Sequence, residues 1–155
     1  MLRSSVRRAS ARATLILAAL ASMLALTVGA APVAGASASV YYLPVGCWSG
    51  TATTTLGTTE SVESHFYLNG KFEVSTPTGD FTGSWKSTGP RTFTYGFVRT
   101  LPGPGGVVIG TIDIKHSATF TAWNTYTSTG TATAYDLNGN VLFSGPVSST
   151  GTRTL

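Results

Sequence analysis

The sequence predicts an all-β protein that folds as a single eight-stranded antiparallel up-and-down barrel. Three observations lead to this fold class. Beyond the first 38 residues no segment shows sustained helical periodicity, and the composition is rich in Thr, Ser, Gly, aromatic and β-branched residues, which favours strands. Apolar and polar residues alternate along several segments, and turn signals separate these segments every eight to fifteen residues.

Eight segments are predicted to be strands, and alternation assigns an inner face to most of them. They cover residues 47–55, 61–68, 71–76, 81–87, 91–101, 107–121, 126–136 and 141–153. In the second strand the inward positions are Val62, Ser64, Phe66 and Leu68. In the fifth they are Phe93, Tyr95 and Phe97. Each strand thus buries one face and exposes the other, as antiparallel sheets do.

The turn signals predict short connections between successive strands. Asn69-Gly70 supplies the positive φ angles of a tight hairpin, and Asn138-Gly139-Asn140 marks a second tight turn. Short connections favour a meander, and eight strands can close on themselves and remove the sheet edges. Such a barrel has room for side chains or for one small ligand. A Greek-key sandwich stays open, because turn spacing alone does not fix connectivity.

The first 38 residues are predicted to be a cleavable signal peptide with a short linker. Four arginines lie in a head without acidic residues, an apolar run covers residues 13–28, and small residues follow. The run is shorter than the ~20 residues of a typical membrane span. The predicted cleavage site follows Ala36 or Ala38, which leaves residues 39–155 as one secreted barrel domain without a stable membrane anchor.

Charge and cysteine content exclude several classes of protein. The four signal arginines carry the whole formal charge of +4, so residues 39–155 hold six basic and six acidic residues. A neutral domain lacks the electrostatic footprint of a nucleic-acid-binding protein. Cys47 is the single cysteine, so no intrachain disulfide can form. It is expected to be a small buried apolar residue or a handle for intermolecular pairing.

The two ends of the predicted domain carry a familiar pattern. Gly46-Cys47-Trp48 opens the first strand, and Gly151-Thr152-Arg153 closes the last. A Gly-x-Trp followed by a terminal arginine resembles the lipocalin and wider calycin pattern. The resemblance implies that Trp48 plugs the closed end of the barrel and that Arg153 covers it. First and last strands are neighbours in a closed barrel, which allows a cation–π contact between the two side chains.

A wider likeness covers nearly all of residues 39–155. The runs at 81–85, 89–95, 136–142 and 151–153 resemble small secreted actinobacterial proteins of lipocalin-like or allene-oxide-cyclase-like barrel type. Calycin relatives bind small apolar molecules, whereas allene-oxide-cyclase-like barrels close rings inside the cavity. The resemblance therefore implies the fold and leaves binding and catalysis both open.

Two residues are candidates for chemistry in the barrel interior. His116 shares parity with Ile112, Ile114, Ala118 and Phe120, so alternation points its imidazole inward, where it could act as an acid, base or ligand donor. A β-bulge near it or a hydrogen-bonded core histidine are the alternatives. Tyr95 lies on an apolar face and could orient a bound carbonyl, or it could be a core aromatic.

Further candidates for ligand contact are inward aromatic residues and one arginine. Arg99 follows Tyr95 and Phe97 on the same face and could meet a carboxylate at the cavity mouth or reach solvent. The predicted ligand-binding set is Phe66, Tyr95, Phe97, Arg99, His116 and Phe120. His65 and His116 fall on opposite faces and no zinc-ligand spacing occurs, so neither a metal nor another cofactor is expected. No nucleophile elbow, phosphate loop or dinucleotide fingerprint occurs.

Three functions are consistent with these features. The favoured one is a secreted barrel, monomeric or weakly dimeric, that binds a small apolar or amphipathic molecule. The second is a cyclase or isomerase that uses the cavity as a dry container, with His116 and Tyr95 as proton handlers. The third is a structural or interaction module of the cell envelope whose barrel is filled.

Overall fold

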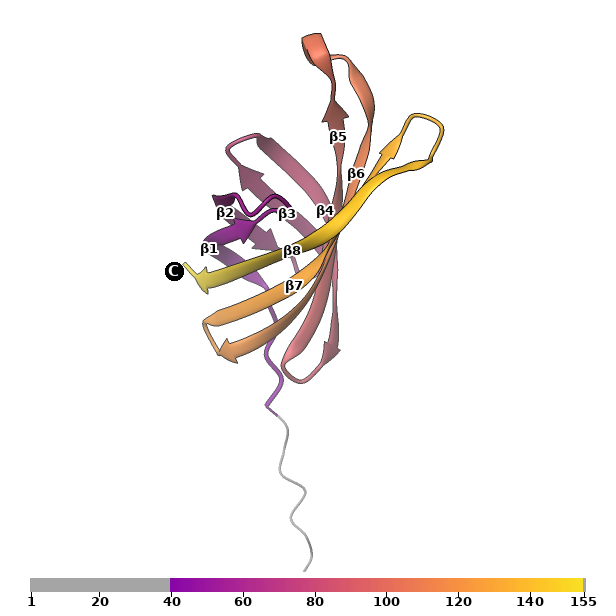
Figure 1. Cartoon of the computed structure of the whole chain (residues 1–155). Helices are drawn as coiled ribbons and strands as arrows, with labels where there is room; N and C mark the ends of the chain where they lie inside the picture. Colours follow the sequence, from indigo (N-terminus) through magenta and orange to yellow (C-terminus); the bar gives the residue numbers. More distant parts are fainter. Residues whose placement is uncertain (1–39, 155) are drawn as a thin grey trace, which may run out of the picture. The chain divides into compact units, whose positions relative to one another are not determined.

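The computed structural model describes residues 40–154 and shows eight strands. The predicted signal peptide lies outside the described residues. The strands are β1 (Gly46–Thr53), β2 (Thr59–Phe66), β3 (Lys71–Thr76), β4 (Gly79–Gly89), β5 (Thr92–Pro102), β6 (Val108–Ala122), β7 (Thr125–Asp136) and β8 (Val141–Arg153). A 3₁₀ turn, η1 (Pro104–Gly106), caps the hairpin between β5 and β6 (Figure 1). In this part of the chain no helix is long and apolar enough to cross a membrane.

The strands form one closed antiparallel barrel in sequence order, which confirms the predicted topology. Each strand pairs with the next, and β8 returns to pair with β1. The closing register places Trp48 opposite Arg153 and Thr53 opposite Ser148. A Greek-key sandwich is thereby wrong for this chain, because all eight strands belong to a single sheet without a free edge.

Tight turns form where the sequence predicts them, and one inward assignment is wrong. Gly70 and Gly139 adopt φ angles of +85° and +83°, as the Asn-Gly pairs require. Strand β2 ends at Phe66, two residues before its predicted end, because the Tyr67 amide already donates to the Lys71 carbonyl across the turn. Leu68 therefore lies in that turn, 79% exposed, rather than on the inner face.

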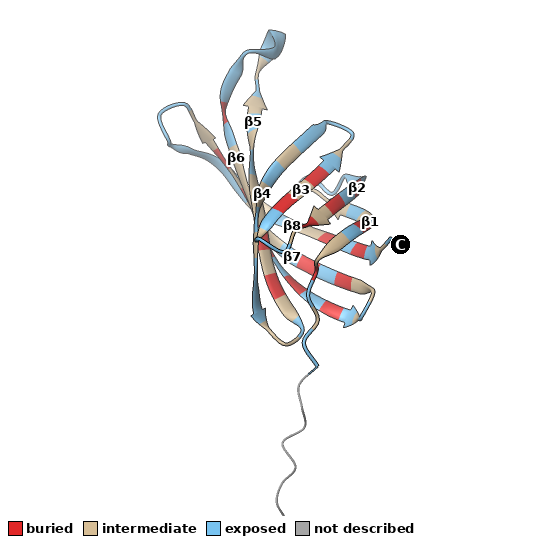
Figure 2. Cartoon of the chain, turned by 180° about the vertical axis from the view of Figure 1, so that it is seen from behind, coloured by how far each residue is buried: buried red, intermediate tan, exposed pale blue. Residues whose placement is uncertain are grey.

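Buried aromatic side chains gather at one end of the barrel. Trp48, Phe66, Phe93 and Phe120 are at most 2% exposed, and Tyr126 packs against them, with ring centroids 5.1 Å apart for Trp48 and Tyr126. Buried residues alternate with exposed ones along the strands (Figure 2). Each of these buried aromatic rings removes a large apolar area from water, which stabilises this end of the barrel.

The segment before β1 completes this closed end. The Trp48 indole N–H donates to the carbonyl of the fully buried Pro44 at 2.6 Å. Tyr42 packs edge-on against Phe120, with ring centroids 5.6 Å apart, and its amide donates to the Pro90 carbonyl. Irregular backbone without alternation carries no strand signal, so the sequence did not predict that the segment before β1 contributes to the plug around Trp48.

Glycines allow the long strands to bend sharply. A Cβ atom at Gly83 would lie 1.9 Å from the Gly96 carbonyl oxygen, and one at Gly130 would lie 1.9 Å from the Lys115 carbonyl oxygen. Only glycine permits such close backbone approach in a coiled sheet. Beyond the bends the β5–β6 and β7–β8 hairpins extend past the barrel body, at the end opposite the aromatic plug (Figure 1).

Candidate functional site

The barrel contains a cavity of about 390 Å³ that opens at the end opposite the plug. Its apolar lining comes from inward positions of seven strands, namely Ala52, Val62, Phe72, Val74, Phe97, Ile112, Ile114, Ala132, Phe143 and Val147. The turn between β1 and β2 contributes Thr54, Thr55 and Leu56 to the mouth. The inward apolar side chains and the polar mouth together form a cavity that suits an apolar molecule.

A cluster of hydroxyl groups and one imidazole lies deep in the barrel. The Tyr95 hydroxyl lies 2.6 Å from Ser149 Oγ and 2.9 Å from Ser128 Oγ. The two serine hydroxyls are 2.8 Å apart, and Ser128 Oγ is 3.0 Å from His116 Nδ1. The Tyr95 and His116 rings stack with centroids 4.7 Å apart. All four residues are buried, and all but Ser128 line the cavity.

One ring nitrogen of His116 belongs to this cluster. Its Nδ1 contacts Ser128 Oγ, which is also within hydrogen-bond distance of the Tyr95 hydroxyl, Ser149 Oγ and the Ser149 carbonyl. A serine hydroxyl can donate or accept, so it satisfies Nδ1 of the neutral imidazole in either tautomer.

Burial keeps this cluster uncharged at neutral pH. Desolvation lowers the pKa of His116 from 6.5 to about 4, since no carboxylate compensates the imidazolium. Desolvation likewise raises the pKa of Tyr95 and of Tyr126 above the ordinary value of 10.0. The interior therefore offers hydrogen bonds to a neutral polar group and does not offer a fixed charge there.

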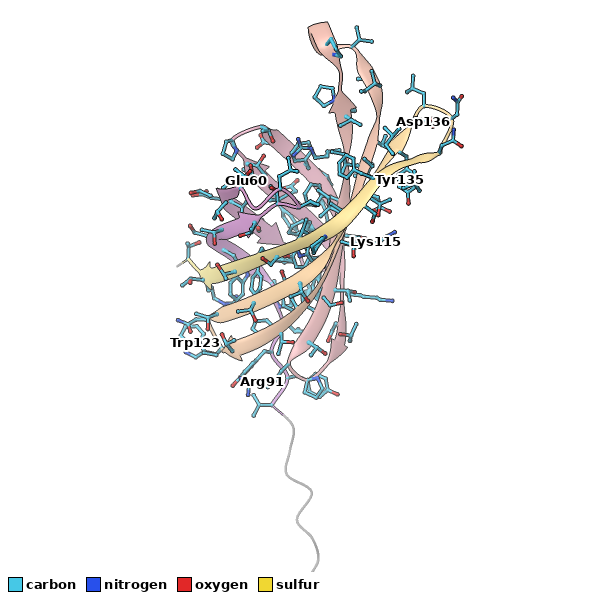
Figure 3. The ribbon with its side chains drawn as sticks, viewed as in Figure 1. Glu60, Arg91, Lys115, Trp123, Tyr135 and Asp136 are labelled. Carbon is cyan, nitrogen blue, oxygen red and sulfur yellow. The ribbon has the colours of Figure 1, made fainter. Side chains whose placement is uncertain are left out.

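Charged residues occur nearer the mouth. Arg99 and Glu60 both line the cavity and are half-buried. Arg99 Cζ lies 5.4 Å from the Phe81 ring centroid, and its Nη1 donates a long hydrogen bond of 3.4 Å to Thr78 Oγ1. Glu60 lies at the end of the barrel opposite Arg91 and Trp123 (Figure 3). The cavity thus runs from a charged mouth to a neutral polar floor.

Four of the six predicted ligand-contact residues line the cavity, and two do not. Tyr95, Phe97, Arg99 and His116 are in its wall, whereas Phe66 and Phe120 are absent from it. Phe66 and Phe120 lie in the closed-end plug, 0% and 1% exposed. Alternation predicts which face of the sheet a residue lies on, but not how far along the barrel axis it lies. Both residues are near the end of their strand, and they therefore lie in the plug rather than in the cavity wall.

The predicted barrel-closing pair is in contact. Arg153 Cζ lies 4.4 Å from the Trp48 ring centroid. Its Nη2 donates to the Leu43 carbonyl at 2.9 Å, and Nη1 donates to the Val45 carbonyl. The guanidinium therefore fastens the segment before β1 onto the plug as well as covering the indole.

Sequence reasoning missed the serines of the polar floor. Ser128 shares parity with Tyr126 on β7, and Ser149 shares parity with Gly151 on β8, so both were predictable as inward polar residues. Phe143 also lines the cavity although it is 46% exposed. The available signal was a small hydroxyl side chain at an inward position, which needs a partner when buried.

Cys47 lies on the outer surface, contrary to the expectation that it is buried. Its Sγ is 3.6 Å from His65 Nδ1 on the neighbouring strand, and His65 stacks on Tyr67 with centroids 4.0 Å apart. The alternation that directs Trp48 inward directs its neighbour outward. Residues 40–154 contain no group of three or more metal-ligating side chains.

The closed eight-stranded barrel is consistent with a calycin-like fold. No known protein family matches this chain, and no curated protein matches it either.

Proposed function

We propose that this protein is a secreted barrel that binds a small apolar or amphipathic molecule in its interior. The observation that carries the proposal is the hollow of about 390 Å³ with an apolar wall and a neutral hydrogen-bonding floor. Sites for small organic ligands have volumes of about 300–1,000 Å³ and combine such walls with a few polar groups. A filled structural barrel of the cell envelope is disfavoured because this space is open.

The physical basis of affinity would be burial of the ligand. Each square ångström of apolar surface removed from water contributes about 25 cal/mol. The floor cluster would orient the ligand, since a buried hydroxyl or carbonyl needs a hydrogen-bond partner. The lipocalin-like resemblance supports the same function. The proposal includes secretion of the protein after its signal peptide is removed. N-terminal sequencing of protein recovered from culture medium checks cleavage after Ala36 or Ala38.

Ligand-dependent melting tests the binding function. The purified protein is heated with a panel of small apolar metabolites, and a ligand present at about a hundred times its Kd should raise Tm by several degrees. Ile114→Trp fills the cavity and should remove the shift, whereas Val98→Trp adds the same ring on an exposed position and should retain it. A panel without any Tm shift, or a shift that Ile114→Trp leaves intact, contradicts binding in the cavity.

A second candidate is a cyclase or isomerase of the allene-oxide-cyclase-like type. The supporting observation is that His116 and Tyr95 both line the cavity and are linked through Ser128. A neutral imidazole that lines the cavity can exchange a proton with a bound substrate. Products recovered after incubation with bound ligands would reveal turnover, which His116→Gln should abolish while binding persists. Unchanged turnover in that variant would exclude the proposed role.

A further inference from the structure

We propose that the ligand of this cavity carries a carboxylate and that Arg99 at the mouth pairs with it. The inference rests on the proposed binding function and narrows the ligand class to an amphipathic organic acid. It starts from the position of Arg99, which follows Tyr95 and Phe97 along the inner face of β5 and is part of the cavity wall.

One edge of the Arg99 guanidinium has no hydrogen-bond partner within residues 40–154. Nη1 is used by Thr78 Oγ1, and the opposite edge carries Nε and Nη2. Nε is shielded from solvent and still unpaired, although buried donors are almost always satisfied in folded proteins. A carboxylate that reaches this edge would form a bidentate pair with Nε and Nη2.

The charge of Arg99 is also uncompensated in the described part of the chain. The two ion pairs found there join Lys71 to Glu73 and Lys115 to Asp113. Glu60 lines the same cavity but does not approach Arg99 within ion-pair distance. Arg99 therefore has no acidic partner in this part of the chain, and an anion entering the mouth would gain both a charge partner and a hydrogen-bond donor.

The remaining wall defines the rest of the ligand. Between the arginine and the hydroxyl cluster the cavity is lined by apolar side chains, including Val74, Ile112 and Ile114. An apolar body fits there while an acidic head remains at Arg99. A planar carboxylate matches the guanidinium fork better than a spherical ion does.

The test compares two probes of equal chain length, decanoate and decanol, by calorimetric titration of the purified protein at neutral pH. The unaltered protein should bind decanoate about 10- to 100-fold more tightly than decanol, as expected for a charge-assisted pair. Arg99→Gln should remove this preference and leave decanol affinity within about twofold. Lys86→Gln is the control, since it removes one positive charge from an exposed position outside the cavity wall, and it should retain the preference.

The outcomes separate the two levels of the proposal. Equal affinity of both probes for the unaltered protein, or a preference that survives Arg99→Gln, overturns the carboxylate assignment and leaves the binding function standing. Absence of binding by either probe, together with no Tm shift from the apolar panel, overturns the binding function itself. If Arg99→Gln fails to fold, Arg99→Lys serves instead. It keeps the charge without the fork, and an undiminished preference in it overturns the bidentate pair.

Discussion

His116 is a buried histidine whose partners are hydroxyl groups rather than charges. Its Nδ1 lies 3.0 Å from Ser128 Oγ, and its ring stacks on Tyr95. Such an environment satisfies the neutral imidazole and gives no compensation to the imidazolium. Neutrality of this one side chain is therefore a condition for the packing of the cavity floor.

The stability of the protein should consequently fall as His116 is forced to protonate. Its pKa is about 4 in the folded state and 6.5 when unperturbed, so the unfolded state binds the proton first. The contribution is fully retained above pH 6.5 and is lost progressively down to about pH 4, by on the order of 3 kcal/mol. Urea unfolding across this range should show the slope.

Two variants test whether His116 causes this pH dependence of the free energy of unfolding. His116→Gln removes the titrating group while keeping hydrogen-bonding capacity, and should flatten the profile between pH 6.5 and 4. His65→Gln changes the other histidine, on the outer surface, and should leave the profile as it is. A slope that persists in His116→Gln would show that other groups cause it.

At the scale of elements, the bends in the long strands depend on glycine. Gly130 on β7 is opposite His116, and a Cβ atom there would lie 1.9 Å from the Lys115 carbonyl oxygen. Backbone atoms cannot move aside as a flexible side chain can. The close approach of the β6 and β7 backbones at this point therefore requires glycine.

Gly130→Ala should destabilise the protein by about 3 kcal/mol or prevent folding, as overpacking against backbone does. Thr129→Ala, on the exposed face of the same strand, is the control and should change the free energy of unfolding by less than about 0.5 kcal/mol. Chemical unfolding compares the two. Similar midpoints for both variants would contradict a steric requirement at the bend.

The sequence predicted most elements because their local signals are strong. Alternation and Asn-Gly turns identified all eight strands and the order in which they pair. The position of a residue along the barrel axis was not predictable. Phe120 and His116 share a face on β6, yet His116 lines the cavity whereas Phe120 lies in the plug. The segment containing Tyr42 and Pro44 escaped as well, because its role depends on long-range packing against β1 and β6 rather than on a local pattern.

For the whole molecule, the structure divides the barrel into a plugged end and a hollow end. Arg153 belongs to the first, where it covers Trp48 and donates to two backbone carbonyls. Arg99 belongs to the second, where it lines the cavity. If Arg99 pairs with the ligand as proposed, one arginine serves stability and the other serves binding, so the two functions should be separable by substitution.

Arg153→Leu should lower the free energy of unfolding by about 2–3 kcal/mol, because it removes the cation–π contact and the hydrogen bonds to the Leu43 and Val45 carbonyls. Decanol affinity should change by less than about twofold, since Arg153 is not part of the cavity wall. Arg99→Gln should show the opposite behaviour, with near-normal unfolding and altered decanoate binding. If either substitution changed both the free energy of unfolding and the affinity for the probe, the plug and the cavity would be energetically coupled. Ligand binding would then depend on the packing of the whole barrel interior.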